Sequence, residues 1–431
     1  MRYLFYLALS VTLAYSTTLD EISKYALKHS PLIKEAEAQS RLIELNHKQS
    51  RSDQYGELNL IGDYNHYNIE RTLAPLTPSS ISSGTPITTS EDILSVGLSY
   101  SVALFTGFAQ TKTVEIEGIS KEMADIKVDL TKEQLIFNIR SLYLAVLSQQ
   151  EVLKAQNSYI ETLESLTNQI EKELQLGKKA KIDLLKAKVE LKNAQTKRET
   201  LGSNIEITLA SLSAMVGKNV DTNLTPIDVA VEELNYSKET LFKESLSLSR
   251  VKIDNLNVKK ADRFIAKSNS SKFPTISLNS YYGKNYGKDI QSGDIDNETL
   301  WQIGLKAQYN LIDFNKRDIS TQKAKVAKLQ AILKKERNEL ELKKLLSIAI
   351  LNINRSKAEH EGNQAELELS KKTEMIELKR YESGVSTLND LLLAKNRTQF
   401  AKSKLIQSRY EYQKNRYYLE YLQERGVNGE S

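Results

Sequence analysis

Two aspartates stand in the same short sequence context, one in each half of the chain. Asp183 follows Gly177 in GKKAKIDLLKAK, and Asp390 follows Gly384 in GVSTLNDLLLAK. Six of the twelve positions are identical. A carboxylate in the first turn of a helix interacts favourably with the backbone N–H groups exposed there. The repeated motif therefore predicts that the chain makes the same turn twice, each time at the start of a helix.

Other side chains that could carry chemistry are scattered. None of the four histidines has a second ligand at metal-site spacing, and YGKNYGK lacks the Ser or Thr that ends a phosphate-binding loop. The chain has no cysteine, which excludes disulfides, cysteine-ligated metals, a cysteine nucleophile and lipidation of an N-terminal cysteine. We therefore expect no enzymatic activity, no cofactor and no metal. The histidines are His29, His47, His66 and His360.

The charge of the chain is modest for its length. The formal net charge is +5 for 431 residues, and Lys and Glu are interleaved along the sequence. Interleaved charges are typical of solvated helix faces, whereas nucleic-acid surfaces concentrate basic residues. We expect no nucleic acid partner.

The first residues have the features of a secretory signal. Residues 1–16, MRYLFYLALSVTLAYS, contain a basic residue, an apolar run and small residues before the expected cleavage site. A membrane anchor is the alternative, but the run is shorter than the roughly 20 residues that span a bilayer. No later apolar stretch is long enough, so we expect a mature chain without a transmembrane helix.

The composition favours very long helices. The chain has only 17 Gly and six Pro, and Leu, Lys, Glu and Ala dominate. The proline-free arms 110–176 and 316–382 each have 67 residues, or about 100 Å as a helix at roughly 1.5 Å per residue. Two adjacent apolar stripes along the first arm indicate neighbours on both sides, as in a curved wall of helices or a four-helix bundle.

Alternating apolar and polar residues predict strands. The alternation is strict in DILSVGLSYSVALF and WQIGLKAQYNL and weaker in one segment upstream of each. Such a pattern is typical of strands with one apolar and one polar face. We predict strands at about 55–69, 92–105, 273–284 and 299–313.

These elements recur in the same order in both halves of the chain. Each half reads helix, strand, loop, strand, very long helix, turn and helix, which indicates an internal duplication. We assign 17–223 to the first structural repeat and 238–424 to the second, with long helical hairpins at about 110–215 and 316–423. Residues 224–237 form a linker, and 425–431 form a short C-terminal tail.

Four amphipathic strands cannot close a barrel, and an open edge in lipid leaves backbone groups without partners. The strands therefore form either a soluble sandwich or a barrel shared between copies of the chain. Three copies would supply twelve strands, whereas two would supply eight, whose interior is filled by side chains. The secretion signal and the long arms favour a trimeric barrel. The predicted lipid-facing residues are Leu94, Val96, Leu98, Val102, Leu104, Ile303, Leu305 and Leu311. The predicted interfacial aromatics are Tyr100, Trp301 and Tyr309, with Tyr64, Tyr67, Tyr281 and Tyr282 as further candidates.

In these features the chain resembles the TolC family of outer-membrane efflux and secretion ducts. The resemblance rests on the duplicated plan, the junctions SVALFTGFAQ and NLIDFNKRD, the repeated turn, and the helix entry HSPLIKEAEAQ. It implies a mainly helical fold with a transmembrane β part. The assembly would be a homotrimer, with a 12-stranded barrel in the outer membrane of a Gram-negative bacterium and a 12-helix periplasmic tunnel. The junctions lack the family's common proline, with Ala103 and Ile312 in its place.

The resemblance also implies a passive exit duct with partner proteins. A periplasmic adaptor, or membrane fusion protein, would contact the tunnel tips. An inner-membrane transporter of the RND, ABC or MFS class would supply substrates for efflux or type I secretion. The alternative interpretation is a secreted helical envelope stalk or adhesive protein with a soluble β head.

Roles for residues at the two turns follow from the same resemblance. Asp390 would line the periplasmic entrance, and Leu393 stands where some members have a second aspartate. For Asp183, a role at the entrance and a role in stabilising the start of its helix are equally supported. Carboxylates converging on a threefold axis would repel one another and attract cations. Because Ser386 replaces a basic latch residue, we hypothesise that Lys181 or a neighbour holds the entrance closed against Asp390. The adaptor-contacting tips would comprise Gly177, Lys178, Lys179, Gly384, Val385 and Ser386.

Overall fold

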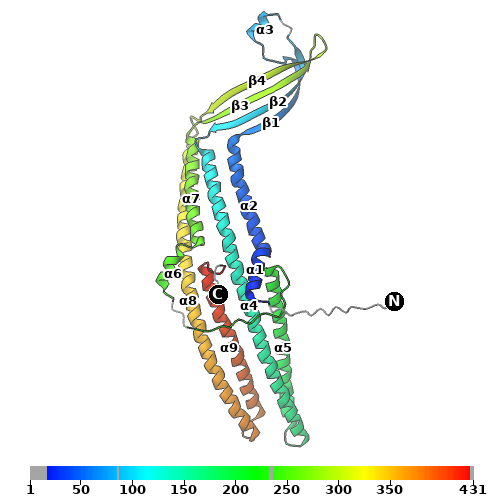
Figure 1. Ribbon diagram of the computed structural model, residues 1–431, viewed down its shortest axis with the longest axis vertical. Helices are drawn as coiled ribbons and strands as arrows, with labels where there is room; N and C mark the ends of the chain where they lie inside the picture. The colour runs from blue at the N-terminus through cyan, green and yellow to red at the C-terminus, as the bar shows by residue number, and fades with distance from the viewer. Residues whose placement is uncertain (1–16, 85–86, 233–235, 428–431) are drawn as a thin grey trace, which may run out of the picture. The chain divides into compact units, whose positions relative to one another are not determined.

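A computed structural model describes residues 17–84, 87–232 and 236–427. The predicted signal sequence 1–16 lies outside the described residues, as do the last four residues of the predicted tail. The described chain is mainly helical with a small antiparallel sheet, which confirms the predicted mainly helical fold with a β part for the single chain (Figure 1). No described helix is both long enough and apolar enough to cross a membrane.

The chain divides into two compact units. One, the sheet unit, covers Gln39–Asp125 and Ile253–Glu336. The other, the hairpin unit, contains the remaining described residues. Both repeats contribute to each unit, because the strands of the two halves join one sheet and the long helical hairpins of the two halves pack together.

The sheet has four antiparallel strands in sequence order. They are β1 (Glu57–Thr72), β2 (Thr89–Phe105), β3 (Thr275–Lys288) and β4 (Ile295–Gln308). The last strand lies further toward the N-terminus than the alternation predicted, so Tyr309 and Leu311 follow it rather than belong to it. Its end is set by pairing, because Gln308 lies opposite Thr275, where β3 begins.

The pairing register gives the sheet one apolar and one polar face. Leu60, Leu98, Tyr282 and Trp301 lie opposite one another in a row across the four strands. Side chains alternate between faces along each strand, so the adjacent row of Asn59, Ser99, Tyr281 and Gln302 lies on the other face. Of the residues predicted to face lipid, the following share the face of Trp301: Leu94, Val96, Leu98, Val102, Ile303 and Leu305. Leu104 falls at a register shift between Ala103 and Phe105.

The apolar face is exposed in the isolated chain. Leu60, Trp301 and Leu305 are between 70 and 75% exposed, although they are large apolar side chains. Monomeric soluble proteins rarely leave such a contiguous apolar surface uncovered. The face therefore requires another apolar phase or partner.

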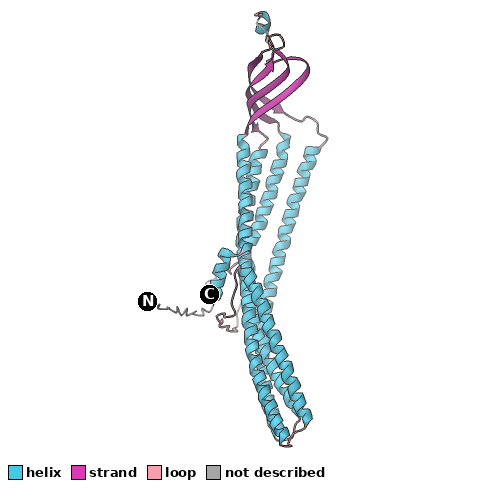
Figure 2. Cartoon of the chain, turned by 90° about the vertical axis from the view of Figure 1, so that its right-hand side faces the viewer, coloured by secondary structure: helices cyan, strands magenta, loops and turns pink. Residues whose placement is uncertain are grey.

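All four helical connections leave the same end of the sheet (Figure 2). Helices α2 (Pro31–Ser52) and α7 (Ser249–Asn269) lead into β1 and β3, and α4 (Ala109–Gln175) and α8 (Lys316–Glu382) follow β2 and β4. The β1–β2 and β3–β4 loops lie at the opposite end, and the first of them includes the short α3 (Pro78–Ser82).

Ion pairs link neighbouring helices of the sheet unit. Glu115 of α4 pairs with Arg263 of α7 at 3.0 Å, and Asp262 of α7 pairs with Lys328 of α8 at 2.6 Å. Helices α4, α7 and α8 therefore follow the order of the strands β2, β3 and β4 to which they are joined.

The strand-to-helix junctions bend without proline. Gly107 and Phe108 both have positive φ, at 61° and 70°, and Phe314 and Asn315 do the same in the second repeat, at 52° and 68°. Two consecutive residues with positive φ therefore stand between the strand and the long helix in each copy. A phenylalanine in this region is strained, so the surrounding structure must hold it there.

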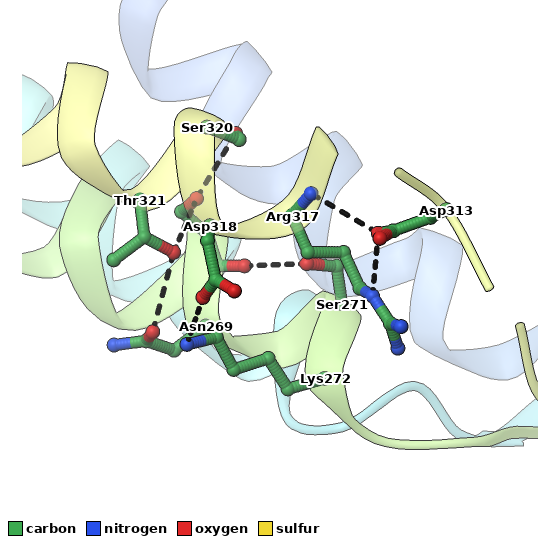
Figure 3. A network of polar contacts seen from close by, with 9 residues as sticks. Asn269, Ser271, Lys272, Asp313, Arg317, Asp318, Ser320 and Thr321 are labelled. Atoms are coloured by element: carbon green, nitrogen blue, oxygen red, sulfur yellow. Dashed lines mark hydrogen bonds and ion pairs between the residues drawn. The ribbon is translucent and has the colours of Figure 1, made fainter. Parts of the chain in front are cut away.

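A polar network fixes the second junction (Figure 3). The Asp313 carboxylate accepts hydrogen bonds from the backbone N–H of Arg317 at 3.1 Å and from its Nε at 2.6 Å. Lys272 pairs with Asp318 at 2.8 Å, which joins the segment between α7 and β3 to the first turn of α8. Thr321 Oγ1 donates to Asn269 Oδ1 at 3.3 Å.

Two long helical hairpins form the hairpin unit. The two long helices, α4 and α8, have 67 residues each, which is the length predicted from the proline-free arms. They pair with α5 (Lys181–Val216) and α9 (Leu388–Leu422). The shorter α1 (Leu19–His29) and α6 (Lys238–Ser245) complete the unit.

The linker and the start of the predicted tail are anchored to α4. The hydroxyl of the fully buried Tyr143 lies 2.7 Å from the carbonyl oxygen of Thr225 and 3.1 Å from that of Thr17. The carboxylate of Glu133, which is only 5% exposed, accepts the backbone N–H groups of Gly426 and Val427 at 2.8 and 3.1 Å.

Candidate functional site: the two hairpin tips

The two predicted turns are the tips of the hairpins. Gly177 and Gly384 have φ values of 72° and 73°, and a Cβ added at either would meet no atom within 4 Å. The backbone conformation rather than packing therefore requires glycine at both positions. In both tips a backbone N–H reaches back five residues, from Lys178 to Glu173 and from Val385 to Arg380, each at 2.8 Å. These bonds close the C-terminal turns of α4 and α8.

The helices that follow the tips begin differently. At the second tip, Asp390 Oδ2 accepts from the backbone N–H and the hydroxyl of Thr387 at 3.0 and 2.7 Å, and the Asp390 N–H donates to the same hydroxyl oxygen at 3.3 Å. This reciprocal arrangement is a capping box. At the first tip, Ala180 occupies the position of Thr387 and offers no side-chain cap. Asp183 therefore lacks the hydroxyl partner that Asp390 has.

The capping box lowers the pKa of Asp390. The main cause is the side-chain hydrogen bond from Thr387, followed by the bond from the Thr387 backbone N–H, because both stabilise the charged carboxylate. The carboxyl is solvent-exposed. Asp390 is consequently charged throughout the neutral pH range.

Asp390 and Leu393 lie on the same outward surface of α9. They are three residues apart, which places them on neighbouring positions of one helix face. Asp390 is exposed and Leu393 is 67% exposed, whereas Leu391 and Leu392 between them are buried. An exposed carboxylate and an exposed leucine one turn further along are thus available to whatever adjoins this face.

A shared apolar core joins the two hairpins behind the tips. It includes residues of all four long helices of the hairpin unit, among them Ile170, Leu184, Tyr381 and Leu391. Above this core the ammonium group of Lys179 lies 3.9 Å from the centre of the Tyr381 ring. This cation–π contact connects the first tip directly to the second hairpin. Tyr381 is 6% exposed, whereas Lys179 is only partly buried.

The structure brings Lys179, not Lys181, to the second hairpin within one chain. Lys181 is exposed, and the ion pairs of the described residues do not include one between Lys181 and Asp390. The hypothesis that Lys181 or a neighbour holds the entrance closed against Asp390 remains a prediction. Val385 is 69% exposed and Lys178 is also exposed, as expected of tip residues available to a partner.

Sequence reasoning had missed the role of Tyr381. This tyrosine precedes Gly384 by three residues, at the position where the first repeat has Leu174. Two differences between the otherwise similar repeats could have indicated this role. The second repeat has Tyr381 where the first has Leu174, and the first has Lys179 where the second has Ser386. Their pairing depends on the packing of the hairpins and is not visible in either segment alone.

The sequence profile of the outer membrane efflux protein family matches residues 22–218 and 253–422. The chain belongs to this family. The match spans both repeats and includes both tips, so the resemblance identified from the sequence is confirmed. A search of curated proteins gave no match.

Solved structures of outer-membrane channels share the fold. The channel CmeC of Campylobacter jejuni is similar at 14% identity with a TM-score of 0.77, over 95% of this chain and 86% of the other. VceC of Vibrio cholerae is similar at 13% identity and a TM-score of 0.76, over 94% and 95%. The open-state MtrE channel of Neisseria gonorrhoeae gives 16% identity and 0.75, over 95% and 89%.

Family membership defines the function at a general level. The protein is an outer-membrane efflux duct of the kind found in tripartite systems of Gram-negative bacteria, with a helical extension in the periplasm. Members of the family are channels rather than enzymes, and they work with adaptors and inner-membrane pumps. Nothing in the comparisons supports the alternative of an envelope stalk.

The capping box predicts a pH response confined to the second tip. Since the pKa of Asp390 is lowered on folding, its stabilising effect is complete above the ordinary value of 3.8 and is lost as the pH falls through the lowered value. We expect hydrogen exchange in the first turn of α9, corrected for intrinsic rates, to accelerate across this acidic range. Asp390→Asn should remove the response. A response of the same size in Asp390→Asn would contradict the assignment.

Proposed function

We propose that three copies of this chain close into one continuous duct, and that the duct conducts substrates passively without a catalytic step. The observation that carries this proposal is the sheet. Within the described chain, β1 and β4 each pair on one side only, and the face that carries Trp301 and Ile303 is apolar and exposed. In a bilayer, unpaired strand edges are excluded, so other chains must complete them.

The two free edges of the sheet unit differ, which favours a ring. One edge consists of β1 and the α2 helix that precedes it, and the other consists of β4 and the α8 helix that follows it. Contact between unlike edges is heterologous, and such contacts close into a ring when the rotation permits. The same edge helices carry exposed apolar residues. They are Leu42 and Leu45 on α2 and Ile319, Val326 and Leu333, spaced by seven residues, on α8.

The number of copies follows from the space inside a barrel. Two copies would give a barrel of eight strands, and side chains fill the interior of a barrel of that size. Three copies would give twelve strands and leave a passage through the barrel. In a trimer the polar row that contains Ser99 and Gln302 would face water, and the row that contains Leu98 and Trp301 would face lipid. Family members are known as trimers, which supports this number.

The hairpin tips are the proposed docking surface for a periplasmic adaptor. The exposed residues there include Lys178 and Val385, held in place by turns of the same backbone geometry in both repeats. Three chains would present six such tips of two alternating kinds. The inner-membrane partner would be a transporter of the RND, ABC or MFS class, in efflux or in type I secretion.

We place the gate at the exposed α9 face of Asp390 and Leu393. Three copies would bring three carboxylates and three leucines around the axis, where the charges would repel one another and attract cations. Lys181 or a neighbouring tip lysine of an adjacent chain would hold the entrance closed.

Asp390→Ala should enlarge the single-channel conductance in planar bilayers and weaken its block by divalent cations, with Asp183→Ala as the matched control. A conductance equal to wild type, with the same cation sensitivity, would remove Asp390 from the gate.

Adjacent residues of β4 test the assignment of faces. Ile303 lies on the apolar face and Gln302 on the polar face, close to the middle of the strand. A lysine facing lipid near the bilayer midplane costs about 2–4 kcal/mol. We expect Ile303→Lys to lower the yield of heat-modifiable oligomer in outer membranes strongly, whereas Gln302→Lys should assemble normally. The opposite result would place the polar face toward lipid.

The experiment that tests the proposed assembly is electron microscopy of the protein extracted from outer membranes in mild detergent. A threefold hollow particle with a helical tube below a short barrel is expected. A monomer that needs no detergent, or a solid rod, would instead favour a soluble β head and the stalk interpretation.

A further inference from the structure

One aromatic residue does not fit the predicted membrane belts. Tyr281 and Tyr282 were both candidates for interfacial aromatics, but neighbouring residues of a strand lie on opposite faces. Tyr282 lies opposite Leu98 and Trp301 on the apolar face and is 62% exposed. Tyr281 lies opposite Ser99 and Gln302 on the polar face and is only partly exposed. In the proposed duct, which this inference assumes, Tyr281 faces the lumen.

Tyr281 is larger than its neighbours on the polar face. The central strands β2 and β3 otherwise present mostly small side chains or none to this face. No second aromatic residue occurs among the paired residues of this face in the described sheet. The small or absent side chains nearest to it in the register include Ser95, Gly97, Ser99, Asn279 and Gly283.

The ring is accommodated above a pair of glycines. Gly97 and Gly283 lie directly opposite each other in the register. A Cβ added to Gly97 would be 2.7 Å from Cε2, Cζ and Oη of Tyr281, and these are its three nearest atoms. A Cβ added to Gly283 would overlap the Tyr281 hydroxyl and lie 2.6 Å from the Val96 carbonyl oxygen. The ring therefore occupies the volume that side chains at both positions would fill.

The φ values of these glycines do not explain them. Neither Gly97 nor Gly283 has a positive φ, so other residues could adopt their conformations. Glycine within a strand weakens it unless something must approach the backbone closely. At Gly97 that neighbour is the Tyr281 ring, and at Gly283 it is the Tyr281 hydroxyl end together with the Val96 carbonyl oxygen. By contrast, a Cβ at Gly304, on the same face of β4, would meet nothing within 4 Å.

We propose that the Gly97–Gly283 pair is a seat that keeps the Tyr281 ring flat against the barrel wall and so sets the width of the passage. Three such rings would lie at one level of the barrel. If a side chain occupied the seat, each ring would have to leave the wall and stand in the lumen. Tyr281 is thus a size-determining residue for passage through the strand section, and the glycines position it.

The absence of cysteine allows a test that does not depend on the periplasmic gate. Ser277 lies on the polar face near the helix end of β3, below Tyr281, and Ser95 lies on the same face toward the loop end. Single cysteines introduced at these positions can be labelled from outside intact cells. The probes are maleimides with polyethylene glycol chains of graded length, too large to enter the periplasm through general porins.

In otherwise wild-type protein, both Ser277→Cys and Ser95→Cys should react with intermediate probes. When Gly97→Ala is added, the larger probes that label the thiol of the Ser277→Cys protein should no longer label it. The rate at which the Ser95→Cys thiol is labelled should stay the same. Tyr281→Ala together with Gly97→Ala should restore access, because the obstructing ring is gone. Gly304→Ala is the matched control and should change neither rate.

The outcomes separate this inference from the proposed assembly. Unchanged size dependence of Ser277→Cys labelling when Gly97→Ala is added would overturn the role of Tyr281 and leave the duct intact. The Ser277→Cys protein could form a folded oligomer in which even the smallest probe does not label the thiol, although the thiol of the Ser95→Cys protein is labelled. That result would overturn the assignment of this face to the lumen and the proposed duct with it. If the Gly97→Ala protein failed to assemble but the variant with both Gly97→Ala and Tyr281→Ala assembled, that difference would support the predicted clash.

Discussion

The unpaired backbone groups along β1 and β4 are the constraint on which the rest of the architecture depends. Each N–H or C=O left without a partner in hydrocarbon costs several kcal/mol, so a four-stranded sheet with an apolar face cannot enter lipid alone. The edges differ, and their completion by copies of the same chain, as proposed, would lead to a ring. Because α2 precedes β1 and α8 follows β4, the helices would acquire the same neighbours as the strands. One pairing requirement would thus account for both the proposed barrel and the wall of helices.

Duplication supplies the same backbone twice but leaves the two copies chemically different. The tip glycines have nearly the same φ, and the long helices have the same length. The side chains around the tips then diverge. Only the second tip has the Thr387–Asp390 capping box, and only the first has a lysine over Tyr381. A ring of three chains would therefore have six similar tips of two chemical kinds, so a partner could distinguish them by charge while meeting one backbone shape.

The sheet shows how packing on one face limits the choice of residues on the neighbouring strand. Tyr281 requires the side-chain space of Gly97, which belongs to the other repeat, and of Gly283, which lies two residues along its own strand. These contacts are possible only because the register places the glycines opposite each other. In the proposed duct, the width of the passage would consequently depend on pairing between the repeats rather than on any single strand.

The sequence by itself determined the elements whose signal is local. Proline-free arms predicted the 67-residue length of α4 and α8, alternation predicted the two faces of the strands, and repeated glycines predicted the tips. These patterns follow from the 3.6-residue and two-residue periods of the backbone. The tertiary structure alone decided where β4 ends, how positive φ values at Phe108 and Phe314 replace proline, that Tyr281 and Tyr282 have different surroundings, and that Lys179 meets Tyr381. Most of these features depend on register or packing between segments far apart in the chain, and local periodicity carries no information about such contacts.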